Sequence, residues 1–209
     1  RIQVYEGGIN EESQDKETGY EQVAPTVYAL VAAIDAKDSF TFQHSTNVSQ
    51  YAVLLAQKLG LSRNDIQTVK VAGLLHDIGK IGIPESILKK AGKLTNEEYE
   101  IMKSHVEKSI EMIHYLPNMN YVIPAVVSHH ERYDGKGYPR GIKGEEIPFL
   151  GRILAVCDSF DAMISKRAYK EPLSVEYAMG ELEKNKGTQF DPEVADAFIE
   201  LIKEGKVPL

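Results

Sequence analysis

Apolar residues recur at helical spacing along most of this chain, and this periodicity limits the folds that it can adopt. From Tyr20 onward the apolar stripes have a helical period, and no strand-like alternation of apolar and polar residues follows. The two clearest stripes are Val23, Val27, Leu30, Val31 and Ile34, and then Val48, Tyr51, Ala52, Leu55 and Leu59. The pattern predicts an all-α domain over residues 20–209, a bundle of about eight helices.

Local signals place several helix ends and one long loop. Thr95 and Glu98 form a capping box, and Asp191, followed by a proline, opens a final helix. Pro148 is expected to start another helix. The capping box precedes one further stripe, made of Tyr99, Met102, Val106, Ile110 and Ile113. Residues 132–148 are predicted to form a long loop.

Composition limits the size, compartment and partners of the domain. With 209 residues, 43% of them hydrophobic, the chain can build one sizeable domain and a short appendage. Apolar runs such as 27–34 and 121–127 are shorter than the roughly 20 residues of a membrane span. The single cysteine, Cys157, excludes an internal disulfide and fits a reducing compartment, and no signal peptide is evident, so we expect a cytoplasmic domain. The sequence begins at Arg1 and not at a methionine, so we also consider that it is part of a longer protein with an upstream membrane anchor.

The net charge of −7 argues against binding to long nucleic acid, which needs many lysine and arginine contacts to phosphates. A small anionic substrate would need positive charge supplied locally, and metal ions would provide most of it. Five of the six histidines stand in patterns that suit metal ligation, whereas His114 matches none and is expected to be an ordinary residue. Histidine and aspartate without thiolate favour iron, manganese or another first-row ion over structural zinc.

Two stretches join ligand-type residues to glycine-rich turns, namely "GLLHDIGKIGIP" (73–84) and "HHERYDGKGYP" (129–139). Together they resemble the HD-GYP family, a branch of the HD-domain metal phosphohydrolases, whose name motifs stand here as His76-Asp77 and Gly137-Tyr138-Pro139. The resemblance covers roughly residues 26–201. It implies an all-helical enzyme that cuts cyclic dinucleotides, with a loop that carries the GYP motif.

The resemblance also implies the site residues. One metal is expected at His44, His76, Asp77 and Asp158, and a second at Asp77, His105, His129 and His130. Asp77 would bridge the two ions, which together lower the pKa of a water and clamp the phosphodiester. The family positions that contact substrate are filled here by Tyr138, Asp161, Arg167 and Lys170. The role of Asp161 is the least defined of these.

Lys80 is expected to stabilise charge on the phosphate during the reaction. It lies one helical turn beyond His76 if that helix persists, but on a turn if Gly79 ends the helix. Two positions depart from the family. Phe40 replaces a glutamate that helps some members to hold a third metal, so we expect a dinuclear centre; Ser109 replaces a glycine and is expected to be tolerated.

The leading hypothesis is metal-dependent hydrolysis of cyclic di-GMP by a bridging hydroxide, giving linear pGpG and more slowly GMP. Alternatives are a phosphodiesterase for cyclic GMP-AMP or another nucleotide phosphate, and a catalytically weak signalling or interaction module. Residues 7–19 read as a linker, and residues 1–6 alternate like a strand that resembles the end of a GGDEF domain. An upstream GGDEF or sensor domain is therefore one possible partner. A second copy of the chain, forming a homodimer, is another.

Overall fold

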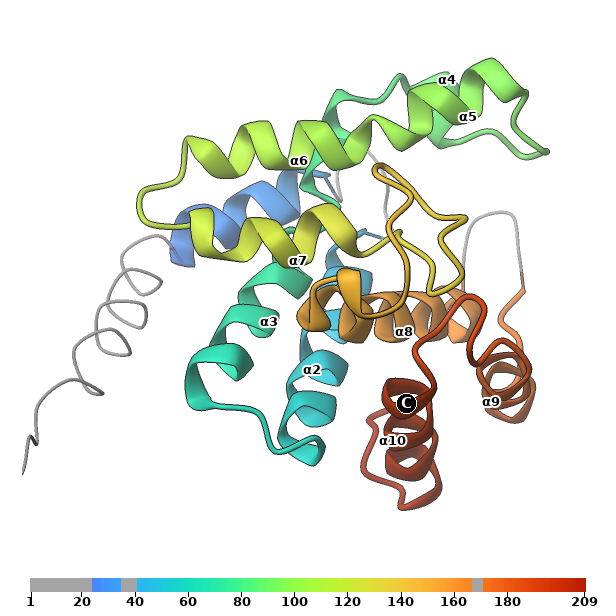
Figure 1. Ribbon diagram of the computed structural model, residues 1–209. Helices are drawn as coiled ribbons and strands as arrows, with labels where there is room; N and C mark the ends of the chain where they lie inside the picture. The colour runs from blue at the N-terminus through green and yellow to red at the C-terminus, as the bar shows by residue number, and fades with distance from the viewer. Residues whose placement is uncertain (1–23, 35–40, 167–170) are drawn as a thin grey trace, which may run out of the picture.

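The computed structural model describes residues 24–34, 41–166 and 171–209 (Figure 1). Within these ranges every regular element is helical, and β-type pairing is limited to an isolated bridge between Lys186 and Phe190. Residues 24–34 form the first described helix. The labelled elements are α2 (Thr41–Lys58), α3 (Arg63–Leu75), η1 (Ile78–Gly82), α4 (Glu85–Leu88), α5 (Asn96–Lys103), α6 (His105–His114), η2 (Asn120–Val122), α7 (Ile123–Ser128), η3 (Gly144–Glu146), α8 (Phe149–Ile164), α9 (Val175–Lys184) and α10 (Pro192–Lys203). The all-α prediction is confirmed.

Some predicted features fall outside the described ranges. These are the strand-like segment 1–6, the linker 7–19, and the side chains Phe40, Arg167 and Lys170. The hypotheses that depend on them stay predictions. No helix in the described part of the chain is long and apolar enough to cross a membrane.

The predicted helix starts are confirmed where the structure describes them. The Glu98 N–H donates to Thr95 Oγ1 (3.2 Å), and the Thr95 N–H donates to Glu98 Oε2 (2.7 Å), which completes the capping box of α5. Asp191 Oδ1 accepts from two backbone N–H groups in the first turn of α10. Pro148 immediately precedes α8. These starts follow from local chemistry, because the capping groups are close in sequence to the donors they satisfy.

The core lies where α2 packs against α3 and α8, with α10 closing one side. Tyr51 of α2, Phe160 of α8 and Phe198 of α10 meet with ring centroids 5.1–6.0 Å apart, and all three are buried. Burying one such side chain contributes on the order of 1.5–3 kcal/mol. The aromatic cluster therefore fixes α2 and α8, the two helices that carry His44 and Asp158.

Two glycines let neighbouring elements approach closely. A Cβ on Gly73 of α3 would lie 2.7 Å from the Cα of Ser49 on α2. A Cβ on Gly79 of η1 would lie 2.0 Å from the carbonyl oxygen of His105, at the start of α6. Both distances are shorter than any ordinary contact, so α2 lies directly against α3, and η1 against α6, only because these positions lack a side chain.

Candidate metal centre

Residues from five parts of the chain converge on one buried cluster. His44 lies on α2, the pair His76-Asp77 joins α3 to η1, and His105 begins α6. The pair His129-His130 follows α7, and Asp158 lies on α8. In Figure 1 the long loop that follows α7 lies above α8. The seven predicted ligand positions are therefore brought together, and their nitrogen and oxygen atoms form overlapping groups within 4.8 Å of one another.

Three of the histidines are held in the same way. The Nδ1 atoms of His76, His105 and His129 lie 2.8, 2.7 and 2.5 Å from the carbonyl oxygens of the residues three positions earlier. Because a carbonyl only accepts, Nδ1 carries the proton and donates, which leaves Nε2 with its lone pair. All three Nε2 atoms are buried, and none of them has a hydrogen-bond partner among the residues that the structure describes. Buried nitrogen lone pairs that face one another without a donor are suited to bind a metal cation.

Asp77 lies between two groups of imidazoles. Its Oδ2 is 3.7 Å from His44 Nε2 and 3.4 Å from His76 Nε2, whereas its Oδ1 is 3.4 Å from His105 Nε2. The potential ligands on the first side are His44, His76 and Asp77, and those on the other are Asp77, His105, His129 and His130. Each carboxylate oxygen therefore faces a different group, which is the arrangement that a bridging ligand requires.

Asp158 completes the first side. Its Oδ1 lies 3.1 Å from His44 Nε2 and 4.0 Å from His76 Nε2. It also groups with His76 and His129, so it lies near the boundary between the two sides. The donor set is nitrogen and oxygen throughout, and the only cysteine, Cys157, is buried with a raised pKa because burial disfavours its thiolate. This set suits a first-row divalent ion.

The two carboxylates of the cluster are ionised. Burial alone would raise the pKa of Asp77, but Lys80 and His76 outweigh it and hold that pKa well below its usual range. Burial is likewise outweighed at Asp158 by the hydrogen bond to His44, which lowers the pKa of Asp158. Burial opposes a proton on His44, yet its hydrogen bonds to the two acidic residues nearby raise its pKa to about 9. That proton must leave before His44 Nε2 can bind a cation.

The histidines on the other side are neutral. Burial lowers the pKa of His105 and of His129, and it lowers the pKa of His130 to about 3. Neutral imidazoles beside ionised carboxylates are the protonation states that metal binding needs. The residues present therefore fit a divalent metal centre.

Lys80 lies at the cluster, but not on a continuation of α3. That helix ends at Leu75, and Lys80 stands in the 3₁₀ turn η1. Its Nζ donates to Asp77 Oδ2 at 2.5 Å. The alternative of a turn is therefore the one that the structure adopts, and the ammonium still reaches the carboxylate.

Ser109 connects η1 to α6. Its Oγ accepts a hydrogen bond from the Gly79 N–H (2.8 Å) and donates one to the His76 carbonyl oxygen (3.0 Å). The side chain is fully buried. The serine therefore fits in place of the family glycine, because its hydroxyl satisfies two backbone groups beside the cluster.

Asp161 was expected to contact substrate, and its surroundings do not agree with that role. The side chain is fully buried on α8. Its Oδ2 lies 2.7 Å from His44 Nδ1 and accepts from Ser165 Oγ (3.1 Å), while its Oδ1 accepts from Asn47 Nδ2 (2.8 Å). Protein groups thus occupy both oxygens, and the carboxylate lies behind His44, on the side away from Asp77. Asp161 is placed to orient the His44 ring instead.

The GYP loop folds back onto the histidine pair. The Tyr138 N–H donates to the His130 carbonyl oxygen (3.2 Å), and the two rings stack with centroids 4.8 Å apart. A Cβ on Gly137 would lie 2.3–2.5 Å from backbone atoms of residues 130–132, so only glycine fits there. The buried Glu131 accepts from the Arg140 N–H (2.7 Å). The glutamate within "HHERYDGKGYP" therefore has a structural role that sequence reasoning missed.

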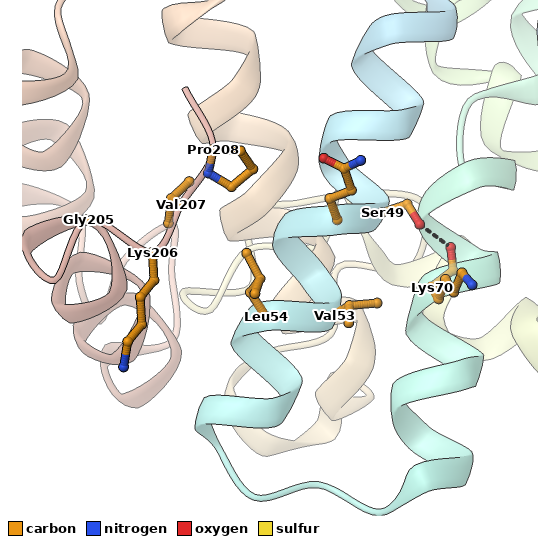
Figure 2. A pocket seen from close by; sticks show the side chains of 9 residues that line it. Ser49, Val53, Leu54, Lys70, Gly205, Lys206, Val207 and Pro208 are labelled. Atoms are coloured by element: carbon orange, nitrogen blue, oxygen red, sulfur yellow. Dashed lines mark hydrogen bonds between the residues drawn. The ribbon is translucent and has the colours of Figure 1, made fainter.

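A pocket of about 630 Å³ lies elsewhere, between α2 and the segment that follows α10 (Figure 2). Val53, Leu54 and Val207 contribute apolar surface, and Ser49 Oγ donates to the Lys70 carbonyl oxygen at its edge. None of the residues that line this pocket belongs to the histidine and aspartate cluster. The candidate chemistry therefore belongs to the cluster and not to this pocket.

Comparison with known proteins identifies the family. The model of the HD domain matches residues 29–194. A cyclic di-GMP phosphodiesterase of Thermotoga maritima is 44% identical over 170 residues, which are 80% of this chain and 46% of that protein. A 3'3'-cGAMP-specific phosphodiesterase 2 of Vibrio cholerae is 39% identical over 176 residues, 83% of this chain and 34% of that protein. The chain thus spans less than half the length of these two relatives.

Solved structures share the fold. Bd1817, an HDG"Y"P protein from Bdellovibrio bacteriovorus, aligns with a TM-score of 0.66 at 19% identity, over 91% of this chain and 64% of that one. The cyclic GMP-AMP phosphodiesterase V-cGAP3 of Vibrio cholerae aligns with a TM-score of 0.68 at 18% identity, over 87% of this chain and 49% of that one. At this identity the likeness concerns the fold alone. Together with the family match and the two name motifs, it shows that the chain belongs to the HD-domain family, in its HD-GYP branch.

Proposed function

We propose that this chain is the catalytic domain of a cyclic di-GMP phosphodiesterase that binds two divalent ions. The observation that carries the proposal is the position of Asp77, whose two oxygens face separate groups of buried imidazoles. His44, His76, Asp77 and Asp158 would hold one ion, and Asp77, His105, His129 and His130 the other. Iron and manganese suit this donor set best.

Bound ions would supply an activated water and a clamp on the phosphate oxygens. The residues of the chain supply the rest of the reaction environment. Lys80, whose Nζ lies 2.5 Å from Asp77 Oδ2, is placed to stabilise the negative charge that develops on the phosphate. Asp161 orients His44 through its hydrogen bond to Nδ1. Arg167 and Lys170 are proposed to contact the phosphates, and Tyr138 the bases.

The proposed reaction adds one water across a phosphodiester bond. The water oxygen forms a bond to phosphorus, the bond from phosphorus to the 3' oxygen breaks, and that oxygen takes up a proton. Cyclic di-GMP opens in this way to linear pGpG, and a second, slower hydrolysis gives GMP. With Phe40 in place of a third-metal ligand, pGpG is expected to accumulate first.

A second candidate substrate is cyclic GMP-AMP, because relatives named for that substrate are 36–39% identical to this chain. The two candidates share the phosphodiester chemistry and differ in one base. The remaining alternative is a catalytically weak module that keeps the fold. All seven ligand positions are filled and buried or half-buried, which counts against a degenerate site.

The test is hydrolysis by purified protein prepared without oxygen, with its metal content measured. Cyclic di-GMP and cyclic GMP-AMP are incubated with wild type and with Asp77→Ala, and the products are separated by chromatography. We expect wild type to form pGpG from cyclic di-GMP and the variant to form none. A wild-type protein that carries metal and leaves both cyclic dinucleotides intact would contradict the proposal.

A further inference from the structure

We propose that the pocket beside Tyr138 is a nucleobase subsite that selects guanine over adenine; this rests on the proposed function. The pocket has a volume of about 240 Å³. Its lining residues are Glu100, Lys103, Ser104, Glu107, Tyr138 and Pro139. It adjoins the metal centre at two points, because Tyr138 stacks on His130 and Ser104 directly precedes His105. A substrate with its phosphate at the metal centre can therefore place a base here.

Aromatic and cationic groups meet beside this pocket, where Tyr99 contacts two of the lining residues, Lys103 and Tyr138. The rings of Tyr99 and Tyr138 pack edge to face with centroids 6.3 Å apart. Lys103 Nζ lies 5.3 Å from the Tyr99 centroid and 5.7 Å from the Tyr138 centroid. Tyr99 is 48% exposed, so part of its ring surface is open to a ligand. Bases stack on tyrosine faces of this kind, whichever base is present.

The charged groups supply the selectivity. Glu100 Oε1 lies 2.6 Å from Lys103 Nζ, and Glu107 lines the same pocket without an ion-pair partner among the described residues. The pocket thus offers two carboxylates, which only accept hydrogen bonds, and one ammonium, which only donates. Guanine presents donors at N1 and N2 and acceptors at O6 and N7. Adenine presents an acceptor at N1 and a donor only at N6, so it cannot offer a carboxylate the adjacent pair of donors that guanine presents at N1 and N2.

A guanine-selective pocket predicts how cyclic dinucleotides that contain adenine should behave. Cyclic di-AMP should be rejected, because it has no guanine to place in the pocket. Cyclic GMP-AMP should bind in a single orientation, with its guanine in the pocket, so one of its two phosphodiesters should be cut. Its opening should therefore give one linear isomer, whereas a pocket that does not distinguish the bases would give both.

The experiment compares the catalytic efficiency (kcat/KM) for cyclic di-GMP, cyclic GMP-AMP and cyclic di-AMP. The variant is the double substitution Glu100→Gln with Glu107→Gln, and the control is Glu111→Gln, an exposed position on α6 outside the pocket. We expect the preference for cyclic di-GMP over cyclic di-AMP to fall by about 10-fold or more in the variant, as for loss of a hydrogen bond to a charged group. The control should keep the wild-type preference, and the variant should release both isomers from cyclic GMP-AMP.

A second pair of variants tests the stacking surface. Tyr99→Ala should raise KM for cyclic di-GMP on the order of 10-fold with little change in kcat, whereas Tyr99→Phe, which keeps the ring, should stay near wild type. Partial misfolding would lower activity on all substrates equally and leave the preference unchanged, and circular dichroism checks it independently. Wild type that uses cyclic di-AMP as well as cyclic di-GMP, or a double variant with the wild-type circular dichroism spectrum and unchanged preference, would overturn the subsite. Absence of hydrolysis of all three substrates would instead overturn the proposed function, and the subsite with it.

Discussion

At the scale of single residues, Asp158 and Asp161 show how surroundings decide the role of a side chain. Both lie on α8, one turn apart, and both contact His44. Asp158 is 16% exposed and faces Nε2, the atom directed at the cluster, whereas Asp161 is fully buried and bonds Nδ1 behind the ring. Sequence identifies both as candidate site residues. It cannot assign them to opposite nitrogens of one imidazole, because that depends on how α2 packs on α8.

Replacing Asp161 by Asn should weaken metal binding without removing a ligand. The amide keeps the shape of the side chain but loses the charged partner of His44 Nδ1, so the ring is oriented less firmly. We expect metal affinity to fall by about 10- to 100-fold. Titration of metal-free protein followed by calorimetry measures this affinity. Asp196→Asn, on the exposed face of α10, is the control, and equal affinity for Asp161→Asn and the control would refute the orienting role.

Replacing Lys80 should lower turnover without lowering the metal content. Its ammonium contacts Asp77 but is not itself a ligand, so Lys80→Ala should leave the bound metal near the wild-type amount. Turnover of cyclic di-GMP should fall on the order of 10²-fold, as for loss of one preorganised charge-stabilising group. Elemental analysis and initial rates on the same preparation give both quantities. Unchanged turnover would mean that the ammonium does not act on the phosphate.

At the scale of elements, the ends of helices position the ligands. His76 and His129 stand directly after α3 and α7, and His105 stands where α5 gives way to α6. The last carbonyls of a helix lack intrahelical partners, and each of these histidines uses one of them to fix its Nδ1 proton. The ring position thus follows from the helix end, and Nε2 is directed inward.

The junction between α5 and α6 also marks a limit of sequence prediction. Apolar spacing predicted one stripe from Tyr99 to Ile113, but the helix is interrupted at Ser104. Ser104 Oγ donates to the Ile101 carbonyl oxygen (2.6 Å), and His105 Nδ1 takes that of Met102. The side chains of Ser104 and His105 therefore hydrogen-bond to the backbone carbonyl oxygens where the helix is interrupted. The capping box at the start of α5 was predictable because it is local, whereas this break depends on the site that forms around His105.

The close approach of η1 to α6 can be tested by replacing Gly79 with alanine, with the same replacement at Gly180 as the control. In Gly79→Ala the new Cβ would meet the His105 carbonyl oxygen at 2.0 Å and the Ser109 nitrogen at 2.4 Å, both backbone atoms. Displacing η1 should destabilise the fold by about 1–3 kcal/mol and lower activity. In Gly180→Ala, within α9, the Cβ meets no atom of the described residues within 4 Å, and stability should rise by about 0.5–1 kcal/mol. Urea unfolding of both variants measures the difference; equal stabilities would contradict the packing described for η1.

At the scale of the whole molecule, the candidate site and the hydrophobic core are built from the same helices. The ligands of the site come from α2, the α3–η1 junction, α6, the end of α7, and α8, and these elements also enclose the main core. The all-α class could be predicted because the apolar period can be seen in the sequence, and the resemblance to the HD-GYP family implied which seven residues cluster around Asp77. The hydrogen bonds around the cluster could not be predicted, such as those between Asp161 and His44 and from the Gly79 N–H to Ser109 Oγ, since they arise only when distant segments meet.

Metal binding should therefore stabilise the entire domain. A cation that binds the folded but not the unfolded chain adds about 2.7 kcal/mol when its concentration is 100 times its Kd. For a domain of this size each kcal/mol raises Tm by roughly 2–4 °C, so saturation with Mn²⁺ should raise Tm by about 5–10 °C. A chelator should reverse the shift, and Asp77→Ala, which lacks the ligand shared by both groups, should show little of it. Differential scanning calorimetry with and without metal measures the effect. An identical Tm in both conditions would argue against a metal centre that links these helices.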